Sequence, residues 1–296
     1  MADYSHLHQS VIPMMDLSQG DRIQQVKTPR WIGYPRANEI LGRLEDLLSH
    51  PKEPRMPGIL LVGPSNNGKT RLIRQFVKRH PVDENPGGEN IIAPVFLIQA
   101  PPTPSESAFY SQILNQMFYT VPAASTEAKR VKVINILKKV GVKVLIIDEL
   151  HNILAGASVK QQQFLNMIKF LSNELEVCIV GCGTGDLLRA VSVDPQIQNR
   201  FTPELLPEWD CDTPFRQLLA SFEQLLPLRE PSVLHSSQLA SQIHALAEGT
   251  IGEVSTLLNT AAEYAIRSGE ERITPEGLKA CGYISPYNRK KVAAKI

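Results

Sequence analysis

Residues 59–70 combine an apolar run, a glycine-rich loop and the start of a helical pattern, an order that few folds use. ILLVG, 59–63, predicts a short buried strand, GPSNNGKT spans 63–70, and KTRLIRQFVKRH continues as a helix. The loop fits the pattern G-x-x-x-x-G-K-[ST] and has the strand and helix flanks that a phosphate-binding P-loop requires. A glycine-rich turn that matches by chance is the alternative, and both flanks argue against it.

Each position of this loop has a physical reason. Gly63 and Gly68 allow a backbone curl that points N–H groups at phosphate oxygens, and the helix that follows adds its positive dipole end. Lys69 can reach the outer phosphates and Thr70 can hold Mg²⁺. We therefore expect ATP at this loop, in contact with Gly63, Pro64, Ser65, Asn66, Asn67, Gly68, Lys69, Thr70 and Arg71.

A second buried strand pattern, VLIIDELHN at 144–152, ends in two acids. A carboxylate at the end of a strand beside a P-loop serves as a magnesium ligand, so we assign Asp148 to Mg²⁺, directly or through a water. Glu149 is then placed to activate the attacking water as general base. The letters D-E-L-H also occur in DExH-box helicases, where His151 would couple hydrolysis to unwinding.

Strand and helix patterns alternate along the first part of the chain. Strands are predicted at 59–63, 91–100, 143–148 and 176–183 with helices between them, which is typical of a parallel sheet with helices on both faces. After residue 212 all patterns are helical. We expect an α/β P-loop core flanked by helices and a C-terminal helical lid, divided into an arm at 1–28, the core at 29–213, the lid at 214–284 and a basic tail at 285–296.

The helical end of the chain argues against a helicase, which needs a second α/β domain. The fourth strand ends in GCGTGD, which places Thr184 beside the γ-phosphate, and Arg200 precedes Phe201. This layout resembles the AAA+ class, in which ATP lies between subunits and an arginine reaches the neighbour's γ-phosphate. We expect Arg200 to be that arginine. Arg189 is a second candidate, and an ordinary surface arginine is the alternative for both.

Four strings narrow this resemblance to a family. GILLVGPSNNGKTRLIRQF, VLIIDELHNILAG, GCGTGDLLRAVSVDPQIQNRFTPELLPEW and GTIGEVSTLLNTAAEYAI resemble the TniB family of transposon-encoded ATPases, relatives of TnsC. The resemblance implies an ATP-dependent regulator of DNA transposition. Such a protein binds double-stranded target DNA, forms a homo-oligomer on it, and links a TniQ-type target-selection protein to the transposase. It would also place Tyr34 near the adenine, with a core or hinge tyrosine as the alternative.

The lid departs from the AAA+ pattern at one point. Many AAA+ lids carry G-x-x-R, whose arginine contacts the nucleotide, but in GTIGEV that position is Gly252 and the next residue is Glu253. We expect no lid arginine. Either another cation takes its place or the ATPase works without one, and slow hydrolysis that acts as a disassembly switch is one consequence.

Composition neither requires nor excludes nucleic acid, because 31 Lys and Arg balance 30 Asp and Glu. Basic residues in two places are candidate contacts. In TEAKRVKVINILKK they are Lys129, Arg130 and Lys132 at the start and Lys138 and Lys139 near the end, with a solvated helix face as the alternative. In the tail they are Arg289, Lys290, Lys291 and Lys295, for which DNA contact, protein contact and disorder all stay open.

No apolar run reaches the roughly 18 residues that cross a bilayer, and MADYSHLHQS is not a signal peptide. The cysteines have no zinc-type spacing. We expect a cytoplasmic, DNA-associated bacterial protein without a membrane partner. A second class of function stays open, namely an AAA+ or STAND-like ATPase switch that acts on a protein partner without binding DNA. ATP and Mg²⁺ are the expected cofactors in both cases.

Overall fold

The computed structural model describes residues 4–120, 125–192 and 195–294. The chain divides into two compact units. The ATPase-core unit comprises 35–65 and 69–206, and the lid unit comprises 1–34, 66–68 and 207–296.

Five parallel strands form the centre of the core unit: β1 (Gly58–Val62), β2 (Val95–Gln99), β3 (Val144–Asp148), β4 (Cys178–Gly183) and β5 (Phe201–Leu205). Their order is β2-β3-β4-β1-β5, so β1 lies between two strands that follow it much later in the chain. The four predicted strands are mostly apolar because helices cover both faces of the sheet. The predicted parallel α/β core is confirmed.

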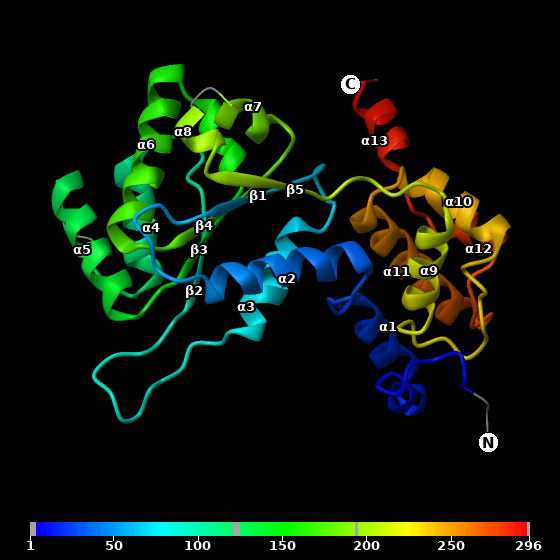
Figure 1. Cartoon of the computed structure of the whole chain (residues 1–296). Coiled ribbons are helices and arrows are strands. Elements are labelled where there is room, and N and C mark those ends of the chain that lie inside the picture. Colours follow the sequence, from blue (N-terminus) through cyan, green and yellow to red (C-terminus); the bar gives the residue numbers. More distant parts are fainter. Residues whose placement is uncertain (1–3, 121–124, 193–194, 295–296) are drawn as a thin grey trace. The chain divides into compact units, whose positions relative to one another are not determined.

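Helices lie on both faces of the sheet (Figure 1). On one side are α2 (Pro35–Ser49) and α3 (Lys69–Arg79), and on the other α4 (Glu106–Gln116), α5 (Thr126–Lys139) and α6 (Ser158–Leu175). The connections add the 3₁₀ helix η2 (Leu150–Ala155) and the short helices α7 (Asp186–Ser192) and α8 (Pro195–Gln198).

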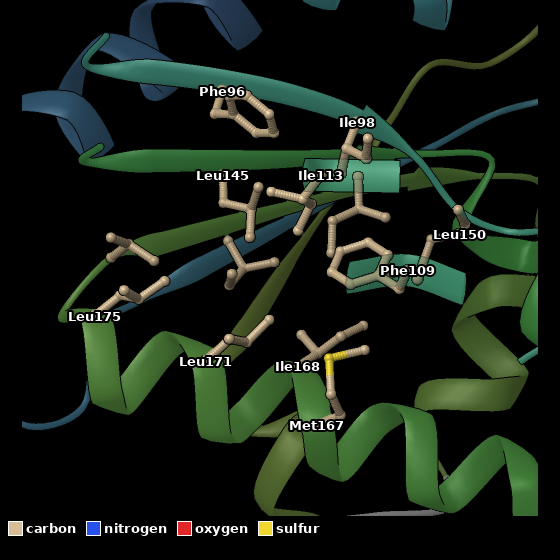
Figure 2. Close-up of a cluster of buried hydrophobic side chains, with 14 of the residues drawn as sticks. Phe96, Ile98, Phe109, Ile113, Leu145, Leu150, Met167, Ile168, Leu171 and Leu175 are labelled. Carbon is tan, nitrogen blue, oxygen red and sulfur yellow. The ribbon is translucent and has the colours of Figure 1, made fainter. Parts of the chain in front are cut away.

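The larger hydrophobic core lies between the sheet and the second set of helices (Figure 2). Apolar residues of α6 recur every three or four positions, which puts them on one stripe of the helix. Figure 2 shows this stripe pointing at side chains of β2, β3 and α4, and its members are Met167, Ile168, Leu171 and Leu175. The packing fixes the strand ends from which the polar residues of the site extend.

Strand β5 was not among the strands that the sequence predicts. Its sequence FTPEL contains Pro203, which lacks a backbone N–H and is tolerated because β5 is an edge strand that pairs only with β1. Glu204 of this strand is 1% exposed and forms ion pairs with Arg36, at 2.9 Å, and with Arg43 of α2. Two arginines far away in sequence therefore compensate the buried acid of this strand.

The lid unit contains five helices after residue 207: α9 (Thr213–Glu223), α10 (Ser237–Ala247), α11 (Ile251–Ser268), α12 (Pro275–Ala280) and α13 (Pro286–Ala293). Residues 1–28, predicted as a separate arm, contribute η1 (Ile12–Asp16) and α1 (Gln19–Lys27) to this unit. Ile23 and Val26 lie in its apolar core, and Arg22 pairs with Glu271. Two apolar residues are too few to give a visible helical periodicity in the sequence. The buried residues against which Ile23 and Val26 pack lie more than 180 positions away.

The basic tail predicted at 285–296 contains α13, which Ser285 caps by accepting a hydrogen bond from Asn288 N at 3.3 Å. Lys295 lies outside the described residues. Among the helices that the structure describes, none is both long and apolar enough to cross a bilayer.

Candidate functional site

The polar residues predicted as a site follow three neighbouring strands of the core unit. The P-loop follows β1, Thr184 follows β4, and Asp148 ends β3. In the sheet, β4 lies between β1 and β3, and Gly63 N donates to Gly183 O at 3.2 Å. Because the strands are parallel, their carboxyl ends share one edge, and the predicted residues meet there.

The P-loop has the curled backbone that its sequence predicts. Asn66 and Gly68 both have positive φ, +59° and +87°, which bends the chain sharply before α3 begins at Lys69. Lys69 is 6% exposed, and its ammonium donates to the carbonyl oxygens of Gly63 at 2.7 Å and Pro64 at 2.6 Å. Burial lowers the pKa of Lys69, while the nearby Glu149 and Asp148 carboxylates act in the opposite direction. A buried cation at a helix N-terminus suits an anionic ligand.

Thr70 and the acid pair are joined directly. Thr70 Oγ1 donates to Asp148 Oδ2 at 2.9 Å, and Glu149 N donates to Asp148 Oδ1, also at 2.9 Å. Asp148 is 8% exposed, whereas the Glu149 side chain is 38% exposed. Thr70 and Asp148 thus form a compact pair of oxygen donors of the kind that Mg²⁺ prefers, and Glu149 is accessible to solvent.

Glu149 has a left-handed backbone, with φ +53°. A non-glycine residue in this region costs free energy, and such strain concentrates at functional positions. His151 Nε2 lies 3.3 Å from Glu149 Oε2. The sequence assigned no role to His151; the turn of η2 that brings it back toward Glu149 was the missing information.

Thr184 follows β4, at the sheet edge that also carries the P-loop and the acid pair. Its hydroxyl is buried and has no hydrogen-bond partner among the described residues. Buried hydroxyls in native proteins are almost always paired, so this group is suited to an oxygen of a bound ligand.

Arg200 lies away from this edge. It immediately precedes β5, and its carbonyl accepts from Gly58 N at 3.0 Å, at the amino end of β1. Arg200 Nη2 donates to Asn173 Oδ1 at 2.7 Å, while Nε and Nη1 are buried without partners in the described part of the chain. Burial, and then the nearby Arg55, lower the pKa of Arg200. The competing candidate Arg189 has an 82% exposed side chain and pairs with Asp186.

The other residues predicted to contact the nucleotide, Tyr34 and Arg71, do not lie in one cluster. Tyr34 lies edge-on to Trp209, with ring centroids 5.0 Å apart, in the apolar core of the lid unit, and Arg71 is exposed in the first turn of α3. At the lid, a Cβ atom on Gly252 would lie 2.1 Å from Asn66 Oδ1. An arginine at 252 therefore has no room, which gives a structural reason for the departure from G-x-x-R.

The basic residues predicted to bind DNA at the start of α5 each interact with another side chain of the core unit. Arg130 pairs with Glu127 and lies 5.4 Å above the Phe170 ring. Lys129 Nζ donates to Ser107 Oγ at 3.0 Å, and Lys132 Nζ lies 4.8 Å from the centroid of the Tyr119 ring.

A family model described as "Bacterial TniB protein" matches residues 22–211. The chain belongs to the TniB family. The match includes the P-loop, the acid pair, Thr184 and Arg200, so the predicted family resemblance is confirmed over the whole core site. No curated protein sequence matches this TniB-family chain.

Solved structures with the same fold include two ORC proteins and a Cdc6 protein. The Aeropyrum pernix ORC1 protein, in complex with DNA, is 18% identical with a TM-score of 0.61 and covers 91% of this chain and 69% of its own. The Aeropyrum pernix ORC2 protein, in ADPNP–ADP complexes, is 18% identical with a TM-score of 0.60, over 87% and 71%. Cdc6p from Pyrobaculum aerophilum is 17% identical with a TM-score of 0.62, over 86% and 69%. At these identities the likeness establishes the AAA+ P-loop fold of this TniB-family chain.

Proposed function

We propose that this TniB-family protein hydrolyses ATP to ADP and phosphate at the P-loop, slowly and as a regulatory step. The observation that carries the proposal is the Thr70–Asp148 hydrogen bond, which joins the P-loop helix to the acid pair at one sheet edge. The buried, unpartnered hydroxyl of Thr184 at the same edge supports it, because that oxygen is suited to a phosphate.

The residues of this edge divide the chemistry among them. Thr70 and Asp148 would hold Mg²⁺, which supplies positive charge beside the β- and γ-phosphates when bound. Lys69 binds the outer phosphates, and its lowered pKa rises again when an anion arrives. Glu149 accepts a proton from the attacking water, and its exposed carboxylate is accessible to that water.

Arg200 completes the site from a neighbouring subunit. Its two unpartnered guanidinium nitrogens can donate to phosphate oxygens, where charge develops during hydrolysis. We therefore propose that the active form is a homo-oligomer, a ring or a helical filament.

Membership of the TniB family supports a role in DNA transposition. We propose that the ATP-bound oligomer assembles on double-stranded DNA in the bacterial cytoplasm and links a TniQ-type target-selection protein to the transposase. Hydrolysis then acts as the disassembly switch. Repeating a few phosphate contacts in every subunit gives avidity, so the near-neutral net charge is no obstacle.

Electrophoretic mobility of a plain DNA duplex tests this function at low salt, with ATP, with ADP and without nucleotide. We expect a shift with ATP that is absent for Lys69→Ala. Absence of any shift from a chain that hydrolyses ATP would rule out the DNA-bound platform and favour a switch that acts on a protein partner.

A further inference from the structure

Glu253, in the first turn of α11, accepts hydrogen bonds from side chains that are distant in sequence. Its Oε1 accepts from Asn66 Nδ2 at 3.0 Å, and its Oε2 accepts from Tyr283 Oη and from Arg289 Nη2, both at 2.6 Å. Burial would raise the pKa of Glu253, but these three donors together outweigh burial and lower it. The carboxylate is therefore ionised at neutral pH although the residue is only 9% exposed.

Asn66 belongs to the tip of the P-loop, and the first turn of α11 also holds this tip through its backbone. Gly252 N donates to Asn66 O at 3.0 Å, and Ile251 N donates to Asn67 Oδ1 at 3.4 Å. Only glycine at 252 allows this approach, because any Cβ atom would overlap the Asn66 side chain. The Glu253 carboxylate is thus fixed beside the tip of the P-loop, the loop at which we propose that the nucleotide binds.

The donors on the far side of Glu253 come from the C-terminal end of the chain. Tyr283 precedes α13, and Arg289 lies within it. The helix is held a second time, because Tyr287 N donates to Glu248 Oε1 at 2.7 Å, at the end of α10. These contacts place the Arg289 guanidinium against the carboxylate.

Arg289 supplies the positive charge that this position needs. An ionised carboxylate beside a triphosphate-binding loop repels the ligand unless a cation offsets it. The Arg289 side chain is 51% exposed, so it reaches Glu253 from the protein surface. A cation held from the surface can be withdrawn without opening the core of the lid unit.

We propose that the Glu253–Arg289 ion pair makes the C-terminal helix α13 a control on nucleotide affinity. While the pair is intact, Glu253 holds the loop tip and its charge is offset. A partner protein that binds α13 separates Arg289 from Glu253. The negative charge of Glu253 beside the phosphates is then uncompensated, and nucleotide binding is weakened. This inference rests on nucleotide binding at the P-loop, as proposed above.

Fluorescence titration of the full chain with an N-methylanthraniloyl derivative of ATP tests the inference. For Arg289→Ala we expect the Kd to rise about tenfold, the order of magnitude for one uncompensated unit charge that repels the phosphates at an effective dielectric constant of about 20. The increase should shrink at high salt, because Arg289 is half exposed. The double variant Glu253→Gln/Arg289→Ala should return to the wild-type Kd, since the repelling charge is then gone. Lys279→Ala, which removes an exposed charge from α12 of the same unit, is the matched control and should leave the Kd unchanged.

Equal Kd values for wild type and Arg289→Ala, with Lys69→Ala weakened, would overturn the inference and leave the proposed function standing. Equal weakening in Arg289→Ala and in the double variant would also overturn it, because Arg289 would then act only by packing α13. A wild-type Kd no better than that of Lys69→Ala would instead remove the proposed function, and this inference with it. Thermal unfolding followed by circular dichroism confirms that each variant is folded.

Discussion

Thr70 and Asp148 are 78 positions apart in the chain and meet through a single hydrogen bond of 2.9 Å between Oγ1 and Oδ2. The bond links the first turn of α3 to the last residue of β3, across the intervening strand β4. The bond holds the two oxygen atoms together, so the proposed Mg²⁺ site would need less ordering when the ion binds.

This pair predicts different outcomes for two substitutions of Thr70. Thr70→Val keeps the shape but removes the hydroxyl, so we expect the ATPase rate to fall about 10- to 100-fold, as when the support of a metal site is removed. Thr70→Ser keeps the oxygen and should retain most of the activity. Titration of the ATPase rate with Mg²⁺ makes the measurement, and an unchanged magnesium dependence in Thr70→Val would contradict the assignment.

Glu149→Gln should separate binding from hydrolysis. The amide cannot accept the proton of the attacking water, so we expect kcat to fall about 10²- to 10⁴-fold with little change in nucleotide affinity. Oligomers on DNA should then persist in ATP, as sedimentation would show. The matched control is Glu84→Gln, at an exposed loop position. Normal hydrolysis by Glu149→Gln would mean that another group acts as the base.

Mixing two inactive variants tests whether Arg200 acts on a neighbour. Arg200→Ala retains its own acid pair, and Glu149→Gln retains its own arginine, so a mixed oligomer contains some sites with both groups intact. We expect partial recovery of ATPase activity in the mixture and none in either protein alone. Arg189→Ala, measured in parallel, should keep its activity because that side chain is paired with Asp186 and largely exposed. No recovery would assign Arg200 to a structural role with Asn173.

The basic start of α5 predicts a change in salt dependence rather than in sequence preference. Lys129→Ala and Lys132→Ala should each weaken duplex binding, and the slope of log K against log salt should decrease by about 0.9 for every phosphate that is no longer neutralised. Lys78→Ala, at the exposed end of α3, is the control. Slopes equal to the wild-type value would show that Lys129 and Lys132 do not contact DNA phosphates and interact only with Ser107 and Tyr119.

The cysteines should differ in their reaction with iodoacetamide. The thiolate is the reactive form, and burial raises the pKa of Cys178 to about 11 and that of Cys182 well above its ordinary value. At pH 8 we expect labelling of the exposed Cys211 and none of the two buried thiols, while in denaturant all four should react. The rate at Cys178 should rise with pH only on approach to its raised pKa. Peptide mass spectrometry reads each site, and fast labelling of Cys182 in the folded protein would contradict the buried core.

Features carried by local sequence could be predicted, and those made by distant partners could not. The P-loop and the acid pair each lie at the end of an apolar strand, so spacing and strand order were sufficient to bring them to one edge. Strand β5 required Arg36 and Arg43 to neutralise its Glu204, 168 and 161 positions away. Nothing in FTPEL itself indicates those partners.

The role of Glu253 shows the same limit. The sequence identified it only as the residue beside a missing lid arginine. Its donors Asn66 and Tyr283 are 187 and 30 positions away, and no periodicity connects them. Likewise, Lys129, Arg130 and Lys132 form one basic cluster in sequence, although in the structure each interacts with a different side chain.

The parallel pairing of β1 with β5 has a kinetic consequence. Arg200 lies at the amino end of this strand pair and the P-loop at its carboxyl end, about 16 Å apart along the strands at 3.3 Å per residue. If Arg200 acts on a γ-phosphate as proposed, that phosphate belongs to another chain, and we expect the reaction order in protein to exceed one. Turnover per subunit should fall toward zero on dilution and rise steeply at the concentration where chains meet. The local concentration of chains on DNA, rather than the concentration of ATP, would then set the ATPase rate.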